Sequence, residues 1–287
     1  MKKTISNKFY DGGIILDFKN TDPFKKILFI KKYFKKYGIL IIKNFKMNPK
    51  KLKEFTNNFS LSYSNDASRR KIRYDEKNIR SVDIGNHEIP LHSESSFTNT
   101  CPEIMWFYAV SVEKKNSTPT TICDGIKVWE NLPLKFKERF LFDPLIFKVS
   151  VNLPYEKRIN NSKKWYIDSI GMKNPIINYK KSKLNFEFTK YAINYDSETK
   201  KISFCNHILS VNDEDQIKSC NFFSKKKFNK TLIKTIKNIT SNYTYDHKWQ
   251  NNQLIILNNK RFLHGRRAIS VGEKRDIVNI QTLVSNF

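Results

Sequence analysis

The sequence predicts a mainly β fold with flanking helices, either a β-sandwich or a jelly roll. From about residue 79 onward, short apolar or alternating runs follow one another, and turn-forming residues separate several of them. Helical periodicity is confined to the N-terminal quarter and to two stretches between these runs. The predicted strands are Ile104–Val112, Thr120–Cys123, Phe147–Val151, Lys201–Phe204, Gln253–Leu257 and Arg275–Val284.

The N-terminal quarter mixes helix and strand. Asp22 followed by proline is typical of a helix start, and apolar residues recur at helical spacing until Gly38, which favours a helix end. The apolar run 38–45 then predicts a buried strand. Asn48, again followed by proline, opens a second helix that extends to about Phe59.

Two further helices and one irregular segment complete the prediction. The helices lie near Leu134–Phe142 and Asn229–Thr240. The segment at about 154–195 is polar, rich in lysine and asparagine and weakly periodic, so we expect an insertion over the sheet that acts as a lid. Because no repeat or linker divides the chain, residues 1–287 are expected to form one domain.

The charge of the chain is strongly positive, with a formal net charge of +26. Arginine is the usual reader of phosphates and bases, but the basic residues are 43 lysines and only 10 arginines, spread over the whole chain. We therefore do not expect a nucleic-acid partner, whereas an acidic protein partner stays open. The eight glycines form no G-x-G-x-x-G or G-K-[ST] motif, which excludes the usual nucleotide-binding loops.

The cysteines and the apolar runs indicate a reduced, cytoplasmic protein. Four cysteines occur without a C-x-x-C motif, and their spacing fits no zinc module. The N-terminus lacks the apolar stretch of a signal peptide, and the longest apolar runs are far too short to cross a bilayer. We therefore expect no membrane association.

Three side chains have the chemistry of a metal site. His92 and Glu94 are two residues apart, so a strand would place them on one face. His264 follows an apolar strand about 170 residues later. Two histidines and one carboxylate form the facial triad of non-haem Fe(II) oxygenases. The alternatives are a surface strand for the H-x-E pair and a strand-end histidine bonded to a carbonyl.

A positively charged strand residue follows the second histidine. Arg275 begins the last predicted strand, and a buried arginine there needs an anionic partner. The distal carboxylate of 2-oxoglutarate would serve, and the hydroxyl of Thr120 could donate to the same group. The alternative is a surface arginine beside Glu273 or Asp276.

Five segments resemble, in order, the taurine dioxygenase (TauD/TfdA) superfamily of Fe(II)/2-oxoglutarate-dependent oxygenases. Within it, the chain looks most like the clavaminate-synthase-like and syringomycin-type aspartyl β-hydroxylase branch. It departs in having Lys-Asn for Arg-Gly in the early strand and Asn-Gln for Gly-Asp before the distal strand. The segments are YGILIIKNF (37–45), IPLHSESSFTNTCPEIMWFYA (89–109), TPTTICDG (118–125), YDSETKKISFCNHI (195–208) and WQNNQLIILNNKRFLHGRRAISVGEKRDI (249–277).

This resemblance implies a double-stranded β-helix (jelly roll) of the clavaminate-synthase-like type. It implies that His92, Glu94 and His264 bind Fe(II), and that Thr120 and Arg275 bind 2-oxoglutarate. The implied enzyme is an EC 1.14.11-type hydroxylase of natural-product biosynthesis that uses O2 and releases succinate and CO2. Because related halogenases replace the ligand carboxylate with a small residue, the retained glutamate disfavours halogenation.

The resemblance also implies a small-molecule substrate, an amino acid or a derivative that is free or tethered to an acidic carrier protein. Three residues are candidate substrate contacts. Glu88 could bind an amine or be exposed, Asn279 could line the pocket or fill the core, and Arg266 could support the iron-proximal carboxylate or face solvent. Desaturation, epimerisation and cyclisation use the same iron site and stay open. A non-catalytic jelly-roll binding module and an oxygenase acting on nucleic acid stay open as well.

Overall fold

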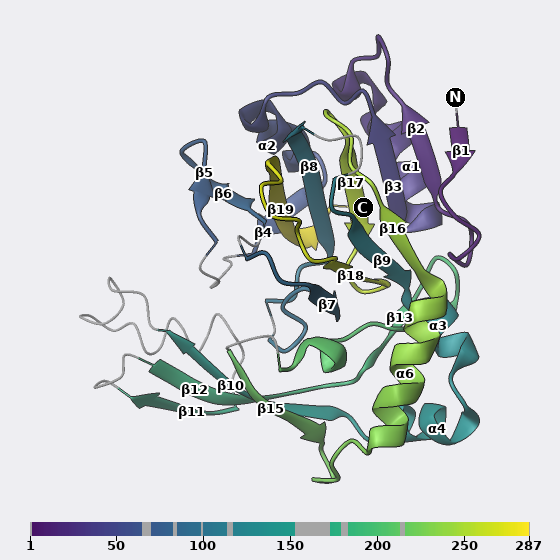
Figure 1. The fold of residues 1–287 in the computed structure, drawn as a ribbon, viewed down its shortest axis with the longest axis vertical. Coiled ribbons are helices and arrows are strands. Elements are labelled where there is room, and N and C mark those ends of the chain that lie inside the picture. The colour runs from purple at the N-terminus through teal and green to yellow at the C-terminus, as the bar shows by residue number, and fades with distance from the viewer. Residues whose placement is uncertain are drawn as a thin grey trace.

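Two β-sheets pack against each other and form the larger part of the protein (Figure 1). The computed structural model describes residues 2–64, 70–82, 85–98, 100–113, 117–152, 173–178, 183–212 and 216–286. In this part of the chain the larger sheet has nine strands, and the ninth, β4 (Ser60–Tyr63), pairs with β19. The other eight are, in spatial order, β1 (Lys2–Thr4), β2 (Ile14–Asp17), β3 (Ile39–Lys43), β17 (Leu254–Asn258), β8 (Ile104–Val112), β19 (Arg275–Ser285), β6 (Glu76–Ser81) and β5 (Ile72–Arg73).

The smaller sheet carries four of the eight candidate site residues, namely His92, Thr120, His264 and Arg266. An apolar core between the two sheets contains Phe107 of β8, Ile255 of β17 and Ile122 of the smaller sheet. Both faces of the central strands are buried, because the alternate residues Trp106 and Ile256 contact a second core on the other side. The smaller sheet consists of β16 (Thr244–His247), β9 (Thr120–Asp124), β18 (Phe262–Arg266) and β7 (Ile89–His92), all antiparallel.

Two helices cover the outer face of the large sheet, α1 (Ile27–Tyr37) and α2 (Pro49–Asn57). The Asp22 carboxylate accepts from the Phe24 N–H, and a 3-10 turn at Pro23–Lys26 leads into α1. Gly38, with a φ of 65°, ends the helix in the left-handed conformation that favours glycine. The predicted N-terminal helices and the strand between them are confirmed.

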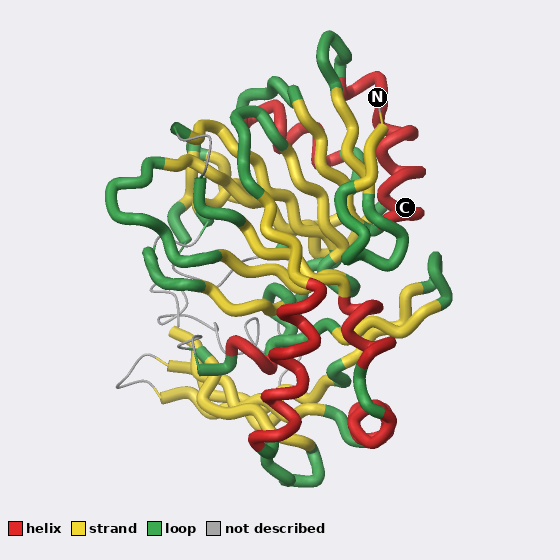
Figure 2. Tube along the Cα trace, turned by 45° about the vertical axis from the view of Figure 1, so that its right-hand side comes forward, coloured by secondary structure: helices red, strands yellow, loops and turns green. Residues whose placement is uncertain are grey.

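A third sheet lies at the other end of the molecule, beside helices α4 (Leu134–Phe142) and α6 (Lys230–Tyr243). Figure 2 shows the helices gathered in two places, against the large sheet and beside this third one. An apolar core joins the third sheet to its helices and to α3 (Gly125–Asn131). The sheet has the order β11 (Lys173–Asn178), β12 (Lys183–Lys190), β10 (Leu145–Asn152) and β15 (Ile217–Phe222), and a separate hairpin pairs β13 (Ile193–Asp196) with β14 (Lys201–Phe204).

The predicted insertion at about 154–195 is more regular than its composition indicates. Residues 153–172 and 179–182 lie outside the described part of the chain. The remainder forms β11, β12 and the start of the following hairpin, because β12 pairs along its whole length with the apolar strand β10. Its proposed action as a lid stays a prediction. Among the described helices, none has the length and apolar character needed to cross a bilayer.

Candidate metal centre

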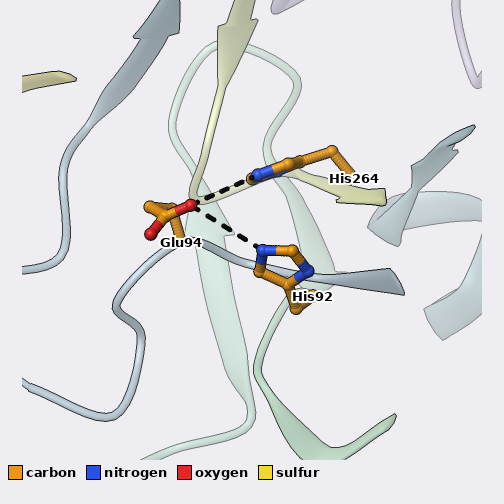
Figure 3. Close-up of side chains that lie close together, drawn as sticks. All are labelled: His92, Glu94 and His264. Carbon is orange, nitrogen blue, oxygen red and sulfur yellow. Dashed lines mark ion pairs between the residues drawn. The ribbon is translucent and has the colours of Figure 1, made fainter. Parts of the chain in front are cut away.

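Two histidines and a glutamate from distant parts of the chain meet between β7 and β18 (Figure 3). His264 in β18 is the cross-strand partner of His92, the last residue of β7. Nε2 of each histidine lies 3.7 Å from Oε2 of Glu94. The three candidate ligand atoms lie within 4.8 Å of one another, and all three side chains are buried. A single ion can therefore contact all three.

Glu94 reaches the histidines by a different backbone path from the predicted one. The alternation argument places both members of the H-x-E pair on one strand, but β7 ends at His92 and Glu94 lies in a turn. The Glu94 N–H donates to Oδ1 of Asn259 over 2.8 Å, and Nδ2 of Asn259 donates to the Glu94 carbonyl over 3.0 Å. A side chain from the turn between β17 and β18 therefore holds the position of Glu94.

Hydrogen bonding determines which nitrogen of His92 faces the cluster. Its Nδ1 lies 2.9 Å from the Pro90 carbonyl oxygen. Since a carbonyl only accepts, Nδ1 carries the proton and the lone pair of Nε2 faces Glu94. At the second histidine, burial and then the neighbouring His92 lower the pKa of His264 to about 4. The His264 imidazole is therefore neutral near pH 7, which is the form that binds metals.

An arginine next to the large sheet lies against the glutamate. Nη2 of Arg70 is 2.9 Å and 3.1 Å from the two carboxylate oxygens of Glu94. Burial opposes the charge, but Arg70 and the hydrogen bonds to both imidazoles bring the pKa of Glu94 well below its usual value. An ionised carboxylate beside two imidazole nitrogens is the donor set that non-haem iron prefers, so the residues present fit Fe(II).

Four of the other predicted site residues line the same pocket as the three candidate ligands. Thr120 begins β9, Arg266 ends β18, and Arg275 and Asn279 lie on β19 of the large sheet. All four are buried or half-buried. The pocket therefore lies where the two packed sheets meet, and residues from both sheets form its wall.

The contacts of Arg275 and Thr120 leave both able to bind an anion. Nη1 of Arg275 donates to the Thr118 carbonyl over 2.7 Å, and burial, followed by the nearby Arg266, lowers the pKa of Arg275 to about 10. The Trp249 indole N–H donates to Oγ1 of Thr120 over 2.9 Å. Since the indole only donates, the hydroxyl hydrogen of Thr120 remains for an acceptor in the pocket.

Of the two alternatives for Glu88, the structure shows the exposed one, because the residue is not among the described residues that line the pocket. The residue precedes β7, and its side chain is 56% exposed. Its carboxylate lies 3.1 Å from Nη1 of Arg267, which also pairs with Asp246 over 3.2 Å. The strand-parity argument fails here because the regular strand begins only at Ile89, and a surface ion pair turns Glu88 outward.

Two residues of the site carry no clear signal in the sequence. Arg70 lies in a short basic cluster without any periodic pattern. Asn259 belongs to an Asn-Asn pair between two apolar strands, which indicates a turn but not a contact with residue 94. Both act through contacts with a residue far away in the chain, and a single sequence does not contain that information.

Comparison with known proteins decides the family. The sequence profile of the "Taurine catabolism dioxygenase TauD, TfdA family" matches residues 15–281, a range that includes every residue of the pocket. The chain belongs to this family. This TauD/TfdA protein is therefore an Fe(II)/2-oxoglutarate-dependent dioxygenase. No curated protein matches the chain.

Solved structures share the fold of this TauD/TfdA protein. AAD-2, solved with Mn(II) and N-oxalylglycine, is 14% identical with a TM-score of 0.64, and the match covers 100% of this chain and 97% of AAD-2. A taurine dioxygenase from Burkholderia xenovorans is 10% identical with a TM-score of 0.64, and the match covers 100% of this chain and 89% of the taurine dioxygenase. PvcB from Pseudomonas aeruginosa is 11% identical with a TM-score of 0.61, and the match covers 98% of this chain and 90% of PvcB. The predicted jelly-roll fold is thereby confirmed.

Proposed function

We propose that this dioxygenase hydroxylates an unactivated C–H bond of an amino acid or an amino-acid derivative. In the balanced reaction, the substrate, 2-oxoglutarate and O2 give the alcohol, succinate and CO2. The observation that carries this proposal is the meeting of the His92, Glu94 and His264 side chains in the pocket that Arg275 lines. The motifs of the clavaminate-synthase-like and aspartyl β-hydroxylase branch support the amino-acid class of the substrate.

In this proposal, His92, Glu94 and His264 would hold Fe(II), and three side-chain ligands would leave coordination positions for other ligands. When bound, Fe(II) with 2-oxoglutarate supplies the activation of O2 that oxidation of an unactivated C–H bond requires. The Pro90 carbonyl holds the His92 ring in one tautomer, and Asn259 holds the main chain of Glu94. Both contacts fix the ligand atoms before the metal arrives, which reduces the cost of assembling the site.

Thr120 and Arg275 bind the distal carboxylate of 2-oxoglutarate in this proposal. Arg275 offers a planar fork of donors, and the free hydroxyl hydrogen of Thr120 offers one more. Arg275 is half-buried, so its charge favours an anionic partner. Phe107 and Ile89 complete the pocket with apolar surface, which excludes water from the reacting atoms.

The proposal is tested in two steps with the full chain. Anaerobic addition of Fe(II) and 2-oxoglutarate should produce a metal-to-ligand charge-transfer absorption band, and His92→Ala should abolish it. Succinate release is then screened in air with free amino acids and with amino acids loaded on a carrier protein. A band without substrate-stimulated succinate release from either set contradicts the amino-acid substrate and favours a non-catalytic binding protein. Absence of the band contradicts the iron and 2-oxoglutarate site itself.

A further inference from the structure

A third buried histidine lies beside the candidate ligands without being one of them. His207 is 2% exposed and follows the hairpin of β13 and β14. Its ring centroid is 5.0 Å from that of His92 and 5.0 Å from that of Phe97, so the imidazole packs against both rings. Neither the proposed ligation of iron nor the proposed binding of 2-oxoglutarate uses this residue.

The hydrogen bond of His207 is made with the residue between two candidate ligands. Its Nδ1 lies 3.1 Å from the carbonyl oxygen of Ser93, which separates His92 from Glu94. Because a carbonyl only accepts, Nδ1 carries the ring hydrogen and donates it. The Ser96 N–H donates to the same oxygen over 3.3 Å, but that bond stays within the turn. Among the described residues, the other ring nitrogen, Nε2, has no hydrogen-bond partner.

The residue before His207 holds the same turn through its main chain. The Ser93 N–H donates to the Asn206 carbonyl oxygen over 2.9 Å. The N–H and the carbonyl of Ser93 are therefore bonded to two consecutive residues of another segment. Since Ser93 is 1% exposed, water cannot readily replace either partner. The turn that contains Glu94 is thus held from both sides.

The segment that holds the turn is itself fixed in the core beside the third sheet. Nδ2 of Asn206 donates to the Ala192 carbonyl over 2.9 Å, and its Oδ1 accepts from the Ile208 N–H over 3.0 Å. Cys205 and Ile208 are buried in the apolar core that joins the third sheet to its helices. Close packing of this kind resists displacement, so the segment is a firm support for the ligand turn.

We propose that His207 is a positioning residue of the metal centre. It holds the turn of Glu94 through the Ser93 carbonyl, and it holds the His92 ring by direct contact. This inference rests on the proposed function, because it gives His207 a part in assembling the iron site. Residues that orient metal ligands in this way contribute about 10–100-fold to metal affinity.

Three substitutions distinguish a directed hydrogen bond from packing alone. Asparagine places its amide nitrogen where Nδ1 lies, glutamine places it near Nε2, and phenylalanine keeps a ring without a donor. We expect His207→Asn to keep the Mn(II) affinity within about threefold of the wild type, and His207→Gln and His207→Phe to lose about 10–100-fold. Packing alone predicts the reverse order, because asparagine leaves the largest cavity and phenylalanine the smallest.

His247→Phe is the matched control. His247 is also buried, at 3% exposure, and packs against an aromatic ring, but its hydrogen bond is with Gln253 and not with the ligand turn. The control should keep the Mn(II) affinity of the wild type. Wild-type affinity in His207→Phe, or a lower affinity in His207→Asn than in His207→Gln, overturns the inference. Urea unfolding of all four variants is measured as well, and losses of affinity that simply follow the free energy of unfolding also overturn it.

The charge-transfer band gives a second readout, because its wavelength depends on the ligand geometry at iron. Each variant is saturated with Fe(II) and 2-oxoglutarate without oxygen. We expect the band of His207→Asn to match the wild type and that of His207→Gln to be displaced. A band at the wild-type wavelength in His207→Gln overturns the positioning role of His207. The band of the wild type would still support the iron and 2-oxoglutarate site, so the inference can fail while the proposed function stands.

Discussion

Asn259 is fully buried, and its side chain bonds to the main chain of Glu94 from both sides. Its Nδ2 also donates to the Pro102 carbonyl over 2.9 Å. A single amide thus joins the turn after β17 to the segment that contains a candidate ligand. In this role Asn259 positions the ligand and does not contact the metal.

We therefore predict that Asn259→Ala weakens both the fold and the metal site. The free energy of unfolding should fall by about 2–4 kcal/mol, because buried main-chain groups lose their partners. Mn(II) affinity should fall by about 10–100-fold, the usual effect of removing a residue that supports a ligand. Urea unfolding and metal titration measure the two effects. Asn258→Ala is the control, since among the described residues the Asn258 side chain has one hydrogen bond, accepted from the Lys260 N–H. Equal loss of metal affinity in both variants would argue against a specific role.

Arg275 gives a second prediction at the residue scale. Arg275→Leu should weaken 2-oxoglutarate binding by about 10–100-fold, because a charge-assisted contact is lost, and should leave Fe(II) affinity nearly unchanged. Titration of 2-oxoglutarate into the anaerobic iron-loaded protein, followed by the absorption band, measures the first quantity. Unchanged 2-oxoglutarate affinity would show that another residue binds the distal carboxylate.

At the scale of elements, the close approach of β18 and β7 sets the distance between the two histidines. Gly265 lies between His264 and Arg266, and β7 passes directly over it. A Cβ atom at this position would lie 3.0 Å from the Pro90 carbonyl oxygen and 2.8 Å from Oγ1 of Thr121. The Cβ atom would also meet the Ile89 carbonyl oxygen. The two carbonyls belong to the main chain of β7 and cannot yield without moving that strand, whereas the Thr121 hydroxyl is a side-chain group.

Gly265→Ala should therefore push β7 away from β18 and separate His92 from His264. We expect a loss of Mn(II) binding of at least about tenfold, together with destabilisation of about 1–3 kcal/mol from overpacking. Gly272→Ala is a useful comparison, because its Cβ would meet nothing within 4 Å and only the backbone strain at its φ of 75° remains. Normal metal affinity in Gly265→Ala would mean that the strand spacing does not control the site.

The elements that the sequence predicts well are those whose own residues determine them. The α1 helix has its cap, its periodicity and its terminating glycine within one segment, and β8 and β19 are rich in apolar residues. The turn at Glu94 and the strand β12 depend on partners far away in the chain, namely Asn259 and β10. The identity of the three candidate ligand residues could be predicted from the sequence. The contacts that hold these residues in place could not, because they are made with residues far away in the chain.

At the scale of the whole molecule, the site depends on two sheets staying packed. The candidate ligands belong to the smaller sheet and its adjoining turn, and Arg275 and Asn279 belong to the larger one. The intervening core also buries His247, whose Nε2 lies 3.2 Å from Oε1 of Gln253. Burial lowers the pKa of His247 from 6.5 to about 4. This residue ties the stability of the whole protein to pH.

We predict that the metal-free protein loses stability as the pH falls from 6.5 toward 4. In this window the unfolded chain binds a proton at His247 and the folded chain does not, so the free energy of unfolding falls by up to about 1.4 kcal/mol per pH unit from this group. Urea unfolding in EDTA at several pH values measures the slope. His247→Gln should reduce the slope of the free energy of unfolding against pH by the contribution of about one proton. An unchanged slope would show that His247 titrates normally in the folded protein.

Anomalous diffraction at the iron edge, from crystals of the full chain grown without oxygen in Fe(II) and 2-oxoglutarate, tests the proposed iron centre most directly. We expect one iron peak in contact with Nε2 of His92, Nε2 of His264 and the Glu94 carboxylate, with the far carboxylate of 2-oxoglutarate on Arg275 and Thr120. An iron peak elsewhere, or none at these three side chains, would contradict the proposed centre.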